Sequence, residues 1–136
     1  MTVFVLDSSA VLRHHDDEAG ADRVEAIFEA CVRGLGSMCI SAVQWGEIAA
    51  VQRKRSGAKE EKRVLQRLMQ IDLSIVPATA ERAVHAAELR VDRRLPYADA
   101  FALDLAMDSP DHVLVTADYD FKTVADLARI EFLPAK

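Results

Sequence analysis

The sequence has few cysteines, no long apolar segment and no surplus of basic residues, and each shortage excludes a class of protein. Its two cysteines, Cys31 and Cys39, form no CxxC pair and lie in apolar segments, which favours reduced packing residues over a disulfide or a metal site. No segment approaches the roughly 20 apolar residues that span a bilayer. The first apolar run is too short for a signal peptide and ends at Asp7. We therefore expect a cytoplasmic protein that does not contact a membrane.

The charge balance is acidic. Lys and Arg number 17 against 22 Asp and Glu, a net charge of −5, which argues against a protein that coats nucleic acid non-specifically, because that mode needs a broad basic surface. An enzyme that acts on nucleic acid is not excluded, since part of the negative charge can be concentrated at a metal site. Residues 53–67 have the opposite balance, with seven basic side chains against two acidic ones. Such a run is most often a solvated helix face.

Short apolar runs alternate with helical patterns along the chain. Runs typical of strands lie at 3–6, 38–40, 73–76, 112–116 and 130–133, and helical patterns at 24–31, 42–56, 58–70, 79–94, 97–107 and 122–129. Ser41 and Thr79 are predicted helix caps, and Gly57 separates two helices. Strands that alternate with helices imply a mostly parallel sheet covered on both faces. A chain of 136 residues has the size of one domain, so we expect residues 1–136 to share one core.

Two acidic residues follow predicted strands. Asp7 comes directly after the first strand, with Ser8 and Ser9 placed to cap a helix, and Asp118 comes just after the run 112–116. In an open α/β sheet, ligands bind beyond the carboxyl ends of the strands, where the strand order reverses. We therefore expect these two strand ends to form part of a binding site.

Two further acidic residues lie among apolar residues on predicted helices. At 100° per residue, Glu47 falls between Val43 and Val51, in the stripe expected to face the core. Asp99 shares a face with three apolar residues in the most apolar predicted helix, where the first turn partly stabilises a carboxylate. A cap or surface role explains either strand-end acid by itself, but buried unpaired carboxylates are rare. The combination therefore indicates a site.

If these four carboxylates converge, they repel one another. Two like charges about 4 Å apart cost on the order of 4 kcal/mol at an effective dielectric constant near 20, so an all-acid cluster takes up protons or holds a cation. Oxygen ligands without His or Cys suit Mg²⁺ or Mn²⁺ rather than Zn²⁺. Such ions activate water and stabilise the leaving oxygen in phosphodiester hydrolysis. The pattern thus favours a metal-dependent hydrolase.

Four segments, in this order and at this chain length, resemble the PIN domain family, and within it the small VapC-type toxins of bacterial toxin–antitoxin pairs. They are Asp7-Ser8-Ser9-Ala10, the helix start from Ser41 to Glu47, Pro96-Tyr97-Ala98-Asp99-Ala100 and Thr116-Ala117-Asp118-Tyr119-Asp120-Phe121. The resemblance covers essentially the whole chain. It implies a PIN-like three-layer sandwich with a mostly parallel sheet of order 3-2-1-4-5. It also implies Mg²⁺- or Mn²⁺-dependent endoribonuclease activity, as the toxin of a toxin–antitoxin pair.

The resemblance also implies roles for particular residues. Thr116 corresponds to a hydroxyl residue beside the acidic site, and Asp120 and Ser9 have supporting roles, although helix capping explains Ser9 equally well. Asp104 has no counterpart, and its helical phase places it away from Asp99. The implied catalytic and metal-binding quartet is Asp7, Glu47, Asp99 and Asp118.

The implied partners are an RNA substrate, an antitoxin and a second copy of the chain. The antitoxin would cover apolar positions such as Val64, Leu65 and Leu68, and it could place a basic side chain among the acids. For the RNA backbone we expect contacts from the basic residues shortly before Asp99. These are Arg90, Arg93 and Arg94.

Two other functions stay open. A phosphatase that forms an aspartyl phosphate also begins with an Asp after the first strand, but such enzymes usually need a second Asp two residues on, where this chain has Ser9. The second function is that of a PIN-like module that binds RNA or protein without cutting it. The intact quartet of acids argues against this function.

Surface exposure or packing explains the histidine pair and two aromatic residues better than a role in a binding site does. His14 and His15 invite a metal-binding interpretation, yet adjacent residues on a helix point about 100° apart, and we interpret the stretch as an exposed turn. Trp45 and Tyr97 could stack on bases, but both neighbour core positions, which favours packing.

Overall fold

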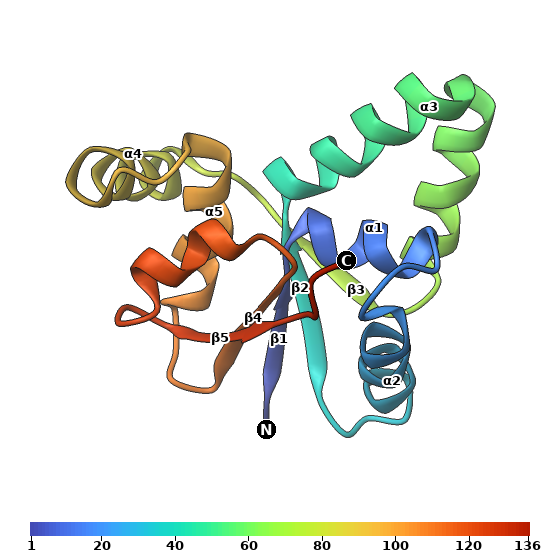
Figure 1. Ribbon diagram of the computed structural model, residues 1–136, viewed down its shortest axis with the longest axis horizontal. Coiled ribbons are helices and arrows are strands. Elements are labelled where there is room, and N and C mark those ends of the chain that lie inside the picture. Colours follow the sequence, from blue (N-terminus) through green and yellow to red (C-terminus); the bar gives the residue numbers. More distant parts are fainter.

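The computed structural model describes residues 1–136. Five strands, five α-helices and one 3₁₀ helix follow one another along the chain (Figure 1). Their order is β1 (Val3–Leu6), α1 (Ser8–His15), α2 (Ala21–Val32), β2 (Ser37–Ser41), α3 (Ala42–Met69), β3 (Leu73–Val76), α4 (Ala80–Arg93), α5 (Tyr97–Ala106), β4 (His112–Thr116), η1 (Tyr119–Val124) and β5 (Arg129–Phe132).

The five strands form one sheet in which every pairing is parallel. Its order is β3-β2-β1-β4-β5, which confirms the predicted topology. β1 is the central strand, and it pairs with β4 from Val3 opposite His112 to Leu6 opposite Val115. Because parallel strands end at the same edge, the residues that follow β1 and β4 meet there.

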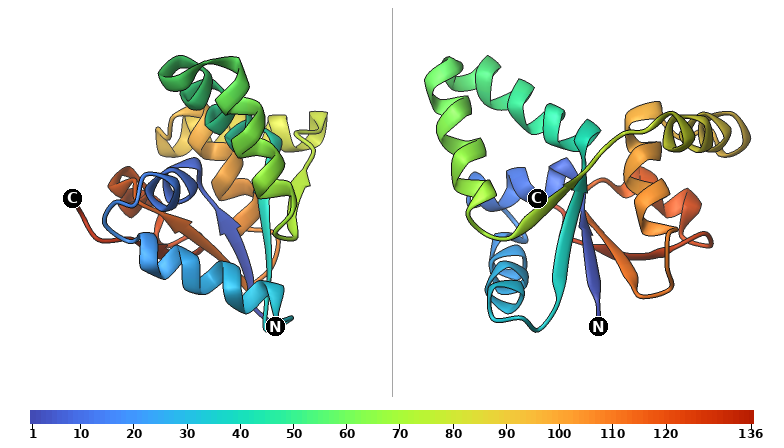
Figure 2. Two further views of the ribbon diagram at one scale, coloured as in Figure 1. Left: turned by 90° about the vertical axis from the view of Figure 1, so that its right-hand side faces the viewer. Right: turned by 180° about the vertical axis from the view of Figure 1, so that it is seen from behind.

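Helices cover both faces of the sheet, as the predicted three-layer sandwich requires. Strand residues alternate between the faces: Leu6 and Val115 pack into a core beneath α1, α2 and the second half of α3, while Val5 and Leu114 pack into a core with α4 and α5. Figure 2 shows α1 and α2 on the opposite side of the sheet from α4 and α5. No helix is both long enough and apolar enough to cross a bilayer.

The longest helix, α3, is broken at Gly57, as predicted. Gly57 has φ of 87° and ψ of 174°, and a Cβ added there would meet nothing within 4 Å. Glycine is therefore favoured by the backbone conformation rather than by packing. The two parts of α3 form an arm that rises from the sheet and returns toward β3 (Figure 1). Ser41 caps the first part by accepting from the Val43 N–H (3.1 Å), and Thr79 caps α4, both as predicted.

Local structure differs from the prediction in three places. The predicted helix at 122–129 is wrong: the chain forms the 3₁₀ helix η1 instead, in which Phe121 and Val124 are both buried three residues apart, the period of a 3₁₀ turn. His14 and His15 are not an exposed turn but the last two residues of α1. On α4 the apolar pattern in the sequence runs through Val84, Leu89 and Val91, but Val84 and Val91 are 61% and 76% exposed, and the buried residues are Ala86 and Leu89.

Candidate functional site

The ends of β1 and β4 bring two carboxylates to one edge of the sheet. Asp7 directly follows β1 and is 3% exposed, and its N–H donates to the carbonyl of Val115 (3.0 Å). Asp118 lies just beyond β4, where its side chain caps η1 by accepting from the Asp120 N–H (2.9 Å). Burial raises the pKa of Asp7, and the nearby charge of Asp118 raises it further. The prediction that these strand ends meet is confirmed.

Two hydroxyl groups hold Asp7 in place. Oδ2 of Asp7 accepts hydrogen bonds from Ser9 (2.6 Å) and from the buried Thr116 (2.8 Å). Ser9 also accepts from the Ala117 N–H (2.9 Å), and Thr116 from the Asp118 N–H (3.0 Å). These bonds lower the pKa of Asp7 against the effect of burial. Thr116 and Ser9 thus lie beside the acid site, where they were predicted to be.

Neither serine is the cap of α1, which corrects the capping interpretation. The residue at the cap position is Asp7, which makes no side-chain capping bond, and Ser8 and Ser9 are the first two residues of the helix. Ser8 donates instead to Oε1 of Glu47 on α3 (3.1 Å), a contact between residues far apart in sequence. Sequence periodicity carries no signal for such a contact.

Glu47 reaches the site from the first part of α3. The fully buried stripe of this part is Gln44, Ile48 and Gln52, one position beyond the predicted one. The predicted residues Val43, Glu47 and Val51 are partly buried at its edge. Glu47 is partly buried at the edge of that stripe. Burial raises its pKa, the charge of Asp7 adds to the increase, and the bond from Ser8 opposes it.

Asp99 lies in the first turn of α5 and completes the group. Its carboxylate is partly buried and has no hydrogen-bond partner among the side-chain and backbone donors of the protein. Burial, and then the charges of Asp7, Asp118, Glu47 and Asp120, together raise its pKa to about 7. Asp99 therefore experiences the field of all the other predicted site acids.

Gln44 links the helices that carry Glu47 and Asp99. Its side chain is fully buried, and Nε2 donates to the carbonyl of Ala98 (2.6 Å), the residue before Asp99. Its Oε1 is buried without a partner, although leaving a polar atom unpaired costs about 1–3 kcal/mol. An apolar side chain on the same stripe would avoid that cost. Gln44 was not predicted from the sequence, because a glutamine on a helix is ordinarily exposed.

The donor set of the site fits a hard divalent cation. Every ligand candidate is a carboxylate oxygen, with hydroxyl groups beside them and no His or Cys. Burial and then the charges of neighbouring acids raise the pKa of Asp7, Glu47 and Asp99, so a cation beside them would stabilise their ionised forms. No three acidic, histidine or cysteine side chains are arranged to hold an ion as they stand. The carboxylates would therefore have to approach one another around a bound ion.

Several predicted residues lie outside this group. Asp104 is buried between α4 and α5, where it accepts from Arg82 (2.8 Å) and bonds His85 (2.7 Å), so it serves the packing of these helices. Arg93, one of the arginines predicted to contact RNA, donates to Asp126 (2.6 Å) and to a carbonyl of η1, and its contact with RNA stays a prediction. His14 pairs with Glu25 on α2.

The two aromatic candidates take part in packing. Trp45 is partly buried against the core beneath α1 and α2. Tyr97 is 38% exposed, its ring meets Phe101 edge to face, and its hydroxyl donates to the Ala83 carbonyl (3.3 Å).

Structures of similar fold come from bacterial toxin–antitoxin complexes. A chain of VapBC2 from Rickettsia felis, bound to a promoter DNA fragment, is 16% identical with a TM-score of 0.76, and the match covers 98% of this chain and 100% of that chain. The sarcin–ricin loop-cleaving toxin VapC20 of Mycobacterium tuberculosis is 16% identical with a TM-score of 0.73, with the same coverage. DNA-bound VapBC of Salmonella typhimurium is 18% identical, with a TM-score of 0.72 over 97% and 98% of the two chains.

At these identities the structures establish the fold and not the activity. No protein of curated function is similar enough in sequence to match the chain. The model of the PIN domain family matches residues 4–127, which contain all four acids described above. With the parallel sheet of order 3-2-1-4-5 and acids at its carboxyl edge, this match shows that the chain belongs to the PIN domain family.

Proposed function

We propose that this protein is a metal-dependent endoribonuclease and the toxin of a toxin–antitoxin pair. The observation that carries the proposal is the environment of Asp99, a partly buried carboxylate without a hydrogen-bond donor and surrounded by other acids, which raises its pKa to about 7. Such a group is stabilised by a proton or by a cation. Nucleases of the PIN domain family generally use divalent metal ions, which supports the second choice.

The proposed ligands of a Mg²⁺ or Mn²⁺ ion are Asp7, Glu47, Asp99 and Asp118. When bound, such an ion lowers the pKa of water and stabilises charge on phosphate oxygens. The residues of the chain orient the acids: Ser9 and Thr116 hold one oxygen of Asp7, and Ser8 holds one oxygen of Glu47. Asp120, through its backbone N–H, fixes Asp118. Each hydroxyl thus leaves a carboxylate oxygen free of side-chain bonds.

The experiment is cleavage of a pool of short fluorogenic RNAs by the purified protein with Mg²⁺, with Mn²⁺ or with EDTA. Asp7→Asn and Asp99→Asn remove a ligand charge at constant size, and Asp111→Asn, an exposed acid beyond the site, is the matched control. We expect metal-dependent cutting that the control retains and both site variants lose. Cutting that survives both variants would indicate a contaminating nuclease, and a folded wild type that binds Mn²⁺ without cutting would indicate a binding module.

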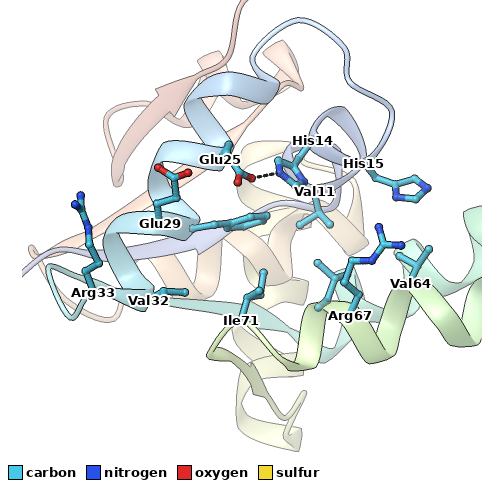
Figure 3. Close-up of a pocket in the computed structure, with 12 residues that line it drawn as sticks. Val11, His14, His15, Glu25, Glu29, Val32, Arg33, Val64, Arg67 and Ile71 are labelled. Atoms are coloured by element: carbon cyan, nitrogen blue, oxygen red, sulfur yellow. Dashed lines mark hydrogen bonds and ion pairs between the residues drawn. The ribbon is translucent and has the colours of Figure 1, made fainter.

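The similar structures support the partner as well as the activity, since they include VapBC complexes bound to DNA and a toxin that cleaves the sarcin–ricin loop. A groove of about 600 Å³ between α1, α2 and the second part of α3 suits the apolar face of an antitoxin helix. Figure 3 shows Glu25 and Glu29 on the α2 side and Arg67 on the α3 side. Its apolar lining is Val11, Phe28, Val32, Val64, Leu68 and Ile71.

The groove revises the residues predicted to meet the antitoxin. Val64 and Leu68 are only 3% and 7% exposed, because they already pack against α1 and α2 beneath the groove. Val32, at 63% exposed, is the residue that a partner would newly cover. Val32→Asp should weaken binding of the co-purified antitoxin, whereas Val91→Asp, at an apolar position on α4 that is 76% exposed, should not. Equal RNA cleavage by the free and antitoxin-bound protein would contradict inhibition.

The implied homodimer stays a prediction. The molar mass of the purified protein in solution tests it directly.

A further inference from the structure

The chain divides into two parts of opposite charge. Residues 53–67, hereafter the basic arm, hold seven basic and two acidic side chains, a local charge of +5, so the rest of the chain carries −10. The basic arm comprises the end of the first part of α3, the break at Gly57 and most of the second part. Such a surface would attract an RNA toward a protein whose remaining charge is on balance negative.

Ion pairs account for only part of this positive charge. Arg53 pairs with Glu61 across the break (2.9 Å), and Arg63 is 3.5 Å from Glu60 within the arm. Arg55 reaches Asp16 at the end of α1 (2.7 Å). The remaining cations are Lys54, Lys59, Lys62 and Arg67, none of which has an acidic partner, and Arg67 lines the groove.

The three lysines lie on both sides of the break at Gly57, and all three are exposed. Lys59 and Lys62 are three residues apart, so they project from one face of the second part of α3. The first part of α3 also carries Glu47, and about 15 Å of helix separates Glu47 from Gly57. The turn that joins the two parts of α3 is the outermost part of α3 in Figures 1 and 2, beyond the end of the sheet where the acids gather.

We propose that Lys54, Lys59 and Lys62 form a docking surface for the phosphate backbone of the RNA substrate. The inference rests on the proposed nuclease activity and adds the surface that brings a polyanion to an acidic site. Phosphate contacts of this kind position a strand without reading its sequence. Lysines on flexible stems suit that role, because each supplies a point charge rather than a fixed geometry.

RNA explains the arm better than an acidic protein segment does. A protein partner would be expected to use the apolar groove, whereas the residues from Lys54 to Lys59 are all exposed and include only one apolar side chain, that of Ala58. A charged surface with little apolar area steers a charged partner electrostatically and binds it in a salt-sensitive way. Both properties are typical of proteins that recognise the phosphate backbone of a nucleic acid.

The experiment measures binding apart from cleavage. Fluorescence anisotropy of a labelled single-stranded RNA of mixed sequence, in EDTA and at a series of salt concentrations, gives the affinity and its salt dependence. The arm variant is Lys59→Ala with Lys62→Ala, and the matched control is Arg129→Ala with Lys136→Ala, which removes two exposed cations elsewhere. Lys59 and Lys62 lie in a helix, which alanine preserves, and Arg129 and Lys136 are exposed residues outside any helix, of which Lys136 pairs with Glu18 (2.6 Å) at the surface, so both variants should unfold near the wild-type urea concentration.

We expect the arm variant to bind RNA roughly tenfold more weakly near physiological salt, with the slope of log K against log salt reduced by about 1.4, or 0.7 for each lost contact. The control should shift both values far less. Equal losses in both variants would overturn the inference in favour of a general charge effect, as would an arm variant that binds like the wild type. A loss of affinity for an acidic polyglutamate peptide but not for RNA would assign the arm to a protein partner instead. A wild type that binds RNA through the arm but never cuts it would refute only the proposed nuclease.

Discussion

Replacing Asp99 by Asn should stabilise the metal-free protein at neutral and alkaline pH, although it removes a proposed ligand. The pKa of Asp99 rises from 3.8 to about 7 on folding, mainly through burial and then through the charges of Asp7, Asp118 and Glu47. Because the folded state holds this proton more tightly than the unfolded chain does, stability is greatest below the unfolded value of 3.8 and falls as pH rises to about 7.

The size of the effect follows from that shift. Each pKa unit corresponds to about 1.4 kcal/mol, so a shift of about three units would give roughly 4 kcal/mol for a fully buried group. Asp99 is only partly buried and solvent screens its charge. We therefore expect Asp99→Asn to raise the free energy of unfolding by about 1–2 kcal/mol at pH 8. The gain should shrink toward pH 5.

Urea unfolding in EDTA at pH 5, 6, 7 and 8 measures this directly. The wild type should lose stability across the series more steeply than the variant, and Asp111→Asn should follow the wild type. Added Mg²⁺ should stabilise the wild type and not Asp99→Asn, because a ligand that binds only the folded state stabilises it. A variant no more stable than the wild type at pH 8 would refute the electrostatic reasoning and with it the main support for a cation site.

Three further substitutions test two side-chain contacts and one backbone conformation. Gln44→Met should weaken Mn²⁺ binding and RNA cleavage by about tenfold, the scale of lost supporting contacts at metal sites, whereas Gln52→Met, at a buried glutamine two turns farther along α3, should change neither. Asp104→Asn should lower the free energy of unfolding in urea by about 2 kcal/mol, because it removes the charge that pairs with Arg82 between α4 and α5. Gly57→Ala should cost about 1 kcal/mol in the same assay, since φ of 87° strains any residue with a Cβ; no loss would show that the arm rearranges freely.

The order of elements was predictable from the sequence because its signals are local. Alternating apolar runs and helical patterns, the caps Ser41 and Thr79, and the break at Gly57 each depend on a few neighbouring residues. Acids directly after two strands were also visible, and parallel strand ends must meet once the order 3-2-1-4-5 is adopted. Four candidate site acids could therefore be named before their distances were known.

The tertiary structure decided which side chains those acids meet, because these contacts join segments that are distant in sequence. The bond from Ser8 to Glu47 spans α1 and α3, and Gln44 joins α3 to the residue before Asp99. The buried stripe of α3 lies one position beyond the predicted stripe, which leaves Glu47 at its edge. The average helical period is too coarse to predict a difference of one position. Asp104, equally acidic and only five residues from Asp99, faces Arg82 and His85 instead. The local sequence pattern determined where acidic residues lie along the chain. Only the packing of helices and strands decided which of these acids are close enough for their charges to interact.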